Sequence, residues 1–144
     1  MMALMLVRQG RFDEAASYLA WMRSFAERRR EHGPSDRRRL DFFYRLFAET
    51  AFLQGHDNES YEWLCRWSAE MPDNGRPYLM LAAIDALYGR EEQARAHMAR
   101  HRQLLPYSTL RYVEMAYPPS TSSLITQRAR LIEGMRNAGL PEGG

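Results

Sequence analysis

Apolar side chains recur at steps of three and four residues along most of the chain, a spacing that places them on one side of an α-helix. No stretch shows the sustained alternation of apolar and polar residues that is typical of a half-buried β-strand. The breaks between the periodic stretches carry glycine, proline, asparagine or aspartate, which are residues that form turns and end helices. The pattern therefore predicts an all-α protein.

The helices are predicted over residues 11–31, 36–54, about 13 residues from Asp57 or Asn58, 77–88, 91–105, 109–116 and a last one ended by Gly139. The first carries its apolar side chains on one face: Phe12, Ala15, Leu19, Met22 and Ala26. The third is expected to have Tyr61, Leu64, Cys65 and Ser68 on one side, and Asp57 or Asn58 as its N-cap. The last is defined by the spacing of Leu124, Arg128, Leu131, Ile132 and Met135.

Two landmarks in the middle of the chain recur with one period. Gly55 and Gly89 are 34 positions apart, and so are Pro72 and Pro106. Such self-similarity indicates a helical repeat array, in which each helix pair buries its apolar side by stacking on the next pair. We therefore read residues 1–144 as a single helical domain, with a partial repeat at 1–40, repeats at 41–74 and 75–108, and a cap at 109–144.

The offsets of the packing residues resemble those of the tetratricopeptide repeat (TPR) family, a 34-residue antiparallel helix pair. The matching positions of the first full unit are Tyr44, Phe47, Ala48, Ala51, Gly55, Ser60, Leu64, Trp67 and Pro72. Those of the second are Tyr78, Leu81, Ala82, Asp85, Gly89, Ala94, Met98, His101 and Pro106. Asp85 and His101 depart from the usual residue types, which we interpret as a looser final interface. The resemblance implies a right-handed superhelix of stacked antiparallel helix pairs, a TPR-like solenoid of about 2.5 repeats with C-terminal capping helices.

An earlier unit is indicated by Gly10 to Ala15, which resemble a repeat turn and the start of a second helix. Its first helix is cut short at Met1. Either the array is truncated there, or its amino-terminal edge is covered by further sequence or by a second copy of the chain, which would make the protein a homo-oligomer.

Composition agrees with a soluble globular protein, since 45% of residues are hydrophobic and 26% are charged. No apolar run approaches the roughly 20 residues of a membrane helix, so no membrane partner is expected. The single cysteine, Cys65, fits a reducing compartment, and we predict a cytoplasmic protein. Arginines at 28–30 and 37–39 form a basic cluster, but interleaved acidic residues and a net charge of +2 favour solvated helix ends over a nucleic-acid site.

Candidate catalytic and metal-binding residues are few. His97 and His101 are four residues apart, a spacing that suits two metal ligands on one helix, but no third ligand has a recognisable spacing. A hydrogen-bonded, partly buried histidine is the simpler expectation, and Cys65 is read as a small core hydrophobe. The sequence has no phosphate-binding glycine loop, hydrolase elbow or zinc-protease motif. We predict no metal, no cofactor and no enzymatic activity.

The family resemblance implies a concave groove lined by the first helices of successive units. The groove residues are Phe42, Arg45, Glu49, Phe52, Arg76, Leu79, Ala83 and Ala86. Their mixture of aromatic, aliphatic and charged groups suits a peptide or a helix. The alternative is a groove filled by the protein's own tail or by a second copy.

The leading hypothesis is therefore a non-catalytic protein–protein interaction module, a scaffold that binds a protein or peptide or associates with itself. A second hypothesis comes from the tail, from Tyr117-Pro118 to Pro141-Glu142, which resembles the end of the TPR regions of bacterial transcriptional regulators and adenylate cyclases. That likeness implies a regulatory or sensory region that acts in signalling through an attached domain.

Overall fold

The computed structural model describes residues 17, 20, 21, 24, 34–116 and 122–143, and every element within residues 34–116 and 122–143 is a helix. The helices are α3 (Pro34–Leu53), α4 (Asp57–Glu70), α5 (Arg76–Leu87), α6 (Glu91–Leu104), α7 (Leu110–Ala116) and α8 (Ser122–Asn137). The all-α class is confirmed for these residues. The helix expected over residues 11–31, with its apolar face, lies outside the described residues apart from positions 17, 20, 21 and 24.

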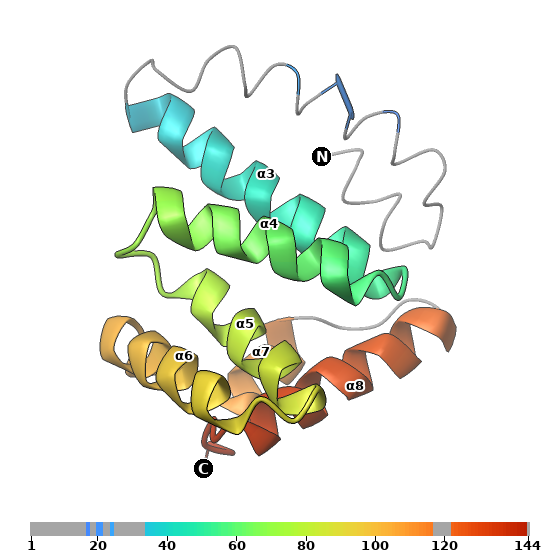
Figure 1. The fold of residues 1–144 in the computed structure, drawn as a ribbon, viewed down its shortest axis with the longest axis vertical. Helices are drawn as coiled ribbons and strands as arrows, with labels where there is room; N and C mark the ends of the chain where they lie inside the picture. The colour runs from blue at the N-terminus through green and yellow to red at the C-terminus, as the bar shows by residue number, and fades with distance from the viewer. Residues whose placement is uncertain (1–16, 18–19, 22–23, 25–33, 117–121, 144) are drawn as a thin grey trace.

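Two helical hairpins make up the middle of the chain, α3 with α4 and α5 with α6 (Figure 1). The turn after α3 contains Gly55 at φ +83°, and the turn after α5 contains Gly89 at φ +75°. At the first turn, the Gly55 N–H donates to Phe52 O and the His56 N–H donates to Ala51 O. This C-terminal motif needs a left-handed residue, which glycine adopts without a steric penalty. Glycine thus ends each first helix and turns the chain back.

The core has two hydrophobic clusters that meet at α5. The first joins α3, α4 and α5 through Tyr44, Ala48, Phe52, Leu64, Trp67, Met71, Met80, Leu81 and Ile84. The second joins α5 to α6, α7, α8 and the segment after α8 through Ala82, Ala83, Ala94, Met98, Leu110, Val113, Ile132, Met135, Ala138 and Leu140. Because α5 contributes to both clusters, it is the central helix of the described structure.

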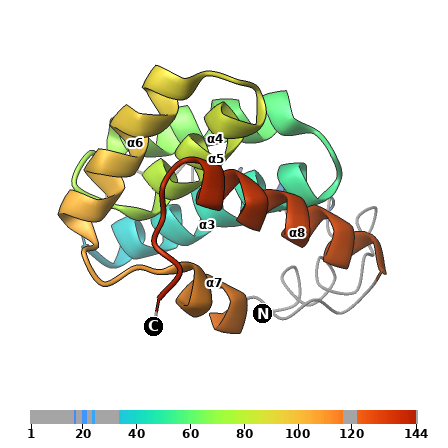
Figure 2. The same ribbon diagram turned by 90° about the horizontal axis from the view of Figure 1, so that it is seen from below.

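Helix α8 lies along α5 and also contacts α3, as Figures 1 and 2 show. Helix α7 begins at Leu110, which is 34 positions after the start of α5 at Arg76. The backbone N–H groups of Leu110 and Arg111 donate to the carbonyls of Pro141 and Glu142. The segment after α8 therefore satisfies donors at the start of α7 that no helical carbonyl can reach.

The buried side of α4 differs from the predicted one. The structure buries Asp57, Ser60, Leu64 and Trp67, while Cys65 is exposed, so the expectation of a core cysteine was wrong. Ser60 accounts for the rotation, since its small side chain is fully buried against α3 and its hydroxyl donates to Ala48 O at 2.7 Å. A small polar residue thus lies buried between α4 and α3, where a hydropathy pattern favours an apolar one.

No described helix combines the length and the apolar character that crossing a membrane requires.

Candidate functional site

The predicted groove residues lie on α3 and α5 and differ widely in exposure. On α3, Phe42, Arg45 and Glu49 are half-buried and Phe52 is fully buried; on α5, Arg76 is exposed, Leu79 and Ala86 are half-buried and Ala83 is fully buried. Arg45 Nε donates to Glu49 Oε1 at 2.9 Å, so these two charges pair within α3. Phe52 and Ala83 present no surface to a partner in this structure.

The side of α5 that carries Leu79, Ala82, Ala83 and Ala86 is covered by α8, and we call it the α5 face. The two backbones approach closely at Gly134, where a Cβ atom would lie 2.5 Å from Ala83 O and 3.0 Å from Leu87 Cγ. Only a residue without a side chain fits at this crossing. Helix α8 of this chain therefore packs against the side of α5 that carries the predicted groove residues Leu79, Ala83 and Ala86.

An ion pair fastens the amino-terminal half of α8. The Arg130 guanidinium makes two hydrogen bonds to the Asp57 carboxylate, one of them 3.0 Å long between Nη1 and Oδ1. Asp57 is only 6% exposed, and the Tyr88 hydroxyl donates to its Oδ2 at 2.6 Å. Burial opposes ionisation, but the hydrogen bonds from Arg130 and Tyr88 outweigh it and hold the pKa of Asp57 below its ordinary value.

The sequence did not predict the ion pair of Asp57 with Arg130; Asp57 was expected instead as a possible N-cap of α4. The N-cap is His56, and Asp57 is the first residue of the helix. The Arg130 guanidinium also lies 5.3 Å from the centre of the Phe52 ring. One arginine of α8 thus contacts both the end of α3 and the start of α4, which no local sequence signal indicates.

A second buried carboxylate, Asp85 of α5, has three donors around it. Tyr61 Oη, Arg90 Nε and His97 Nδ1 lie 2.9, 2.8 and 2.7 Å from its oxygens, and we call these four residues the Asp85 network. Asp85 is 0% exposed, whereas the side chains of Arg90 and His97 are 38% and 28% exposed. Arg90 also stacks on the Tyr61 ring at 5.0 Å. The network joins α4, α5 and α6 through one charge.

His101 also lies at a fully buried position, with its Nδ1 donating to Gly75 O at 2.7 Å. The expectation that Asp85 and His101 mark a looser interface was therefore wrong, because both are buried and hydrogen-bonded. The Nε2 atom of His101 is buried without a partner. Burial lowers the pKa of His101, which outweighs the opposing effect of the Gly75 hydrogen bond.

Burial and the Asp85 carboxylate shift the pKa values of two neighbouring groups, Tyr61 and Cys65. Burial and the hydrogen bond to Asp85 raise the pKa of Tyr61 to about 12, so its hydroxyl stays protonated and donates. Partial desolvation and the nearby Asp85 and Glu62 carboxylates raise the pKa of the Cys65 thiol, which disfavours the nucleophilic thiolate. Among the described residues, no group of three histidine, cysteine or acidic side chains is placed to hold a metal ion.

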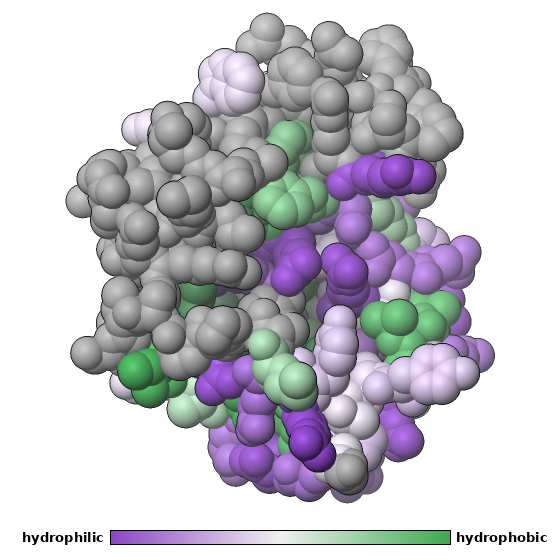
Figure 3. Space-filling model, turned by 180° about the vertical axis from the view of Figure 1, so that it is seen from behind, coloured by the Kyte–Doolittle hydropathy of each residue, from purple (hydrophilic) through white to green (hydrophobic). Residues whose placement is uncertain are grey.

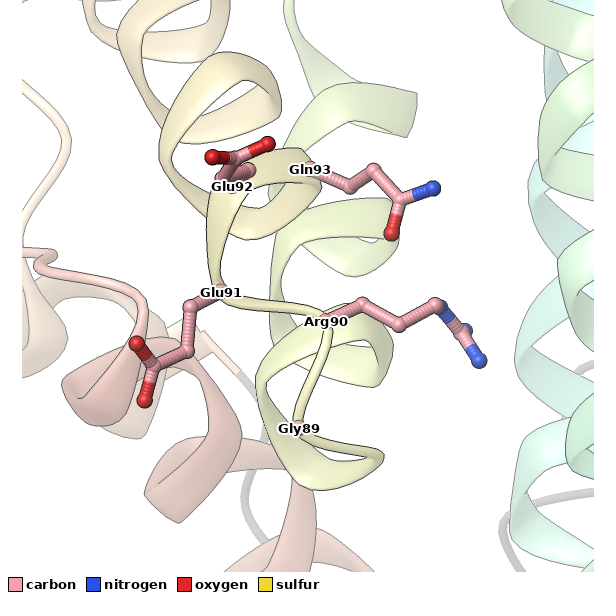
Figure 4. Close-up of a pocket in the computed structure, with 5 residues that line it drawn as sticks. All are labelled: Gly89, Arg90, Glu91, Glu92 and Gln93. Atoms are coloured by element: carbon pink, nitrogen blue, oxygen red, sulfur yellow. The ribbon is translucent and has the colours of Figure 1, made fainter.

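A cavity of about 440 Å³ opens at the turn between α5 and α6, lined by residues 89–93 (Figure 4). The labelled side chains diverge, since Arg90 extends toward α4 while Glu91 points to the opposite side. Groups that point apart cannot bind one small ligand together. On the face opposite to Figure 1, hydrophilic side chains separate the apolar ones of the described residues into small areas (Figure 3).

Of the two arginine runs noted in the sequence, 28–30 and 37–39, the structure describes only the second. Arg28–Arg30 lie outside the described residues, and residues 37–39 fall in the first turns of α3, where Arg38 is exposed.

Comparisons with protein-family models, with curated proteins and with solved structures found no match to this chain. The described residues themselves define an all-helical protein with two buried, hydrogen-bonded carboxylates and a central helix covered by α8.

Proposed function

We propose that this chain is a non-catalytic interaction module, a TPR-like solenoid of stacked antiparallel helix pairs that binds a protein or peptide through its first helices. The observation that carries the proposal is a repetition in the backbone. Helix α6 begins and ends 34 positions after α4, α5 ends 34 positions after α3, and α7 begins 34 positions after α5.

The turn hydrogen bonds repeat with the same offset. The bonds Gly55 N–H to Phe52 O and His56 N–H to Ala51 O have counterparts from Gly89 to Ala86 and from Arg90 to Asp85. The bonds Met71 to Trp67 and Asn74 to Met71 have counterparts from Leu105 to His101 and from Ser108 to Leu105. Backbone bonds do not depend on side-chain identity, so they support a true structural repeat even where Asp85 and His101 differ in type.

Repeat arrays of this kind present extended surfaces for other polypeptides, and the described side chains offer no activated nucleophile or metal site. On α3 and at the start of α5, Phe42, Arg45, Glu49 and Arg76 retain exposed area, which suits charged and aromatic contacts to a partner.

The proposal is tested by site-specific photo-crosslinking in the source cells. A photoreactive amino acid at Arg76 is expected to form a discrete adduct with another polypeptide, while the same group at Arg95, exposed on α6, does not. The absence of an adduct at Phe42, Arg45 and Arg76, together with a strict monomer in light scattering, would contradict the proposal.

A further inference from the structure

The contacts that seat α8 on the α5 face define the kind of partner this surface takes. We infer that the α5 face, together with Asp57 at the start of α4, recognises an amphipathic helix with an arginine four residues before a glycine, and that α8 is its intramolecular occupant. This inference rests on the proposed interaction function and names the partner class.

Charge complementarity gives the first requirement. Asp57 is 6% exposed, and its carboxylate lies where Arg130 of α8 reaches it. A buried carboxylate without a cation is strongly unfavourable, so any helix that replaces α8 must supply a cation at this position. Arginine fits best because its planar group also stacks on the Phe52 ring, 5.3 Å away.

Steric fit gives the second requirement. A Cβ atom at position 134 would lie 2.5 Å from Ala83 O, which is backbone and cannot move aside as a flexible side chain can. The helix that docks here must therefore carry glycine one turn after the arginine. Ile132 and Met135, next to this crossing, are 6% and 2% exposed and fill the apolar part of the α5 face.

The occupant present in the structure is not the best one. Among the residues that the structure describes, the Oε1 atom of Gln127, one turn before Arg130, is buried without a hydrogen-bond partner, and the Gln127 amide lies beside Gly55. An unsatisfied buried polar atom weakens the docked state. A partner helix with methionine or leucine at the Gln127 position avoids this penalty and is expected to bind roughly tenfold more tightly than the α8 sequence.

Exchange of α8 for a partner helix is testable with peptides. A tethered helix acts at an effective concentration on the order of millimolar, so micromolar peptide does not displace α8 from the native chain. The Gly134→Leu chain, in which the new side chain collides with Ala83, releases α8. The matched control is Glu133→Leu, which adds the same side chain at the neighbouring exposed position.

The probe is a fluorescent peptide of residues 124–140, and binding is measured by anisotropy. We expect the Gly134→Leu chain to bind it at micromolar concentration, and the native and Glu133→Leu chains to bind at least 100-fold more weakly.

Charge reversal within the peptide tests the requirement for a cation. On the Gly134→Leu chain, an Arg130→Glu peptide is expected to bind at least tenfold more weakly. An Arg136→Glu peptide, which carries the same change of charge, should stay within about threefold, because Arg136 is exposed and pairs only with the exposed Glu133 and Glu142. When Asp57→Arg is added to the Gly134→Leu chain, the Arg130→Glu peptide should bind more tightly than the native peptide.

Far-ultraviolet circular dichroism tests whether the Gly134→Leu chain is folded. If that chain is unfolded, the peptide measurements are repeated with an Arg130→Glu chain, in which Asp57 has lost its arginine partner. Equal loss of binding for the two charge-reversed peptides, or no binding by a folded variant, would overturn the inference. A polypeptide that crosslinks at Arg76 while the peptide fails to bind would leave the proposed function standing and remove only this inference.

Discussion

The Asp85 network allows a quantitative test of how a buried charge stabilises this fold. Asp85 accepts hydrogen bonds from Tyr61, Arg90 and His97 and is 0% exposed. A hydrogen bond to a charged group contributes about 1.5–3 kcal/mol, and Tyr61 is half-buried, so we expect Tyr61→Phe to cost about 1.5 kcal/mol. Removing one partner of a buried pair costs about 3–5 kcal/mol. Asp85→Ala should lower the free energy of unfolding by about 3 kcal/mol, at the low end of this range, because Arg90 and His97 are exposed enough to be hydrated once Asp85 is removed.

The two changes are expected to be strongly non-additive. Once Asp85 is alanine, the Tyr61 hydroxyl has lost its acceptor, so Tyr61→Phe in that background should cost less than about 0.5 kcal/mol. The coupling energy of the double-mutant cycle is then about 1 kcal/mol.

Urea unfolding followed by far-ultraviolet circular dichroism, extrapolated linearly to water, measures all four free energies of unfolding. Tyr107→Phe is the matched control, since Tyr107 is 93% exposed and its change should alter the free energy of unfolding by less than about 0.5 kcal/mol. If Tyr61→Phe costs the same with aspartate and with alanine at position 85, the hydrogen bond does not stabilise the fold and the reasoning fails.

Three further outcomes follow from single residues. Because burial lowers the pKa of His101, the unfolded chain takes up a proton at a higher pH than the folded chain does. The free energy of unfolding should therefore fall as the pH drops below about 6.5, by at most about 1.4 kcal/mol per pH unit, and urea unfolding of His101→Leu should show a shallower fall. In a spectroscopic titration of tyrosinate, the native chain should differ from the Tyr61→Phe chain by one tyrosine that ionises at about pH 12; the absence of a difference near that pH would refute the assignment. Gly89→Ala should destabilise the chain by about 1–2 kcal/mol in urea, because no described atom lies within 4 Å of a Cβ there and the cost is that of φ +75°; an unchanged midpoint would contradict this.

The helix bounds could be predicted from the sequence because the signals that set them are local. Glycine at 55 and 89 ends the first helices, and proline at 72 and 106 follows the second ones, so α4 and α6 were placed almost to the residue. Burial on α4 was harder to predict. A stripe of apolar residues favoured Cys65 as a buried residue, but the structure exposes Cys65 and buries Ser60, whose hydroxyl donates to Ala48 O of α3.

The buried charges could not be predicted because their partners are distant in the sequence. Asp85 receives its hydrogen bonds from residues 24, 5 and 12 positions away, and Asp57 pairs with Arg130, 73 positions away. Residue type alone favours exposure for an aspartate. The structure buries both aspartates because several donors reach them from different helices, and that arrangement exists only once the helices have packed.

Helix α8 shows where a hydropathy pattern stops being informative. Its apolar stripe, with Leu131, Ile132 and Met135, predicts that one side is buried but not against which neighbour. Leu110 and Val113 of α7 share one hydrophobic cluster with Ala94 and Met98 of α6 and with the α5 face, and Ile132 and Met135 of α8 belong to the same cluster. Two residues outside the apolar stripe then fit α8 to that face: Gly134, which allows the backbone of α5 to approach, and Arg130, which neutralises Asp57. Because these two contacts would also select a partner helix, the position of α8 and the specificity of the surface depend on the same residues.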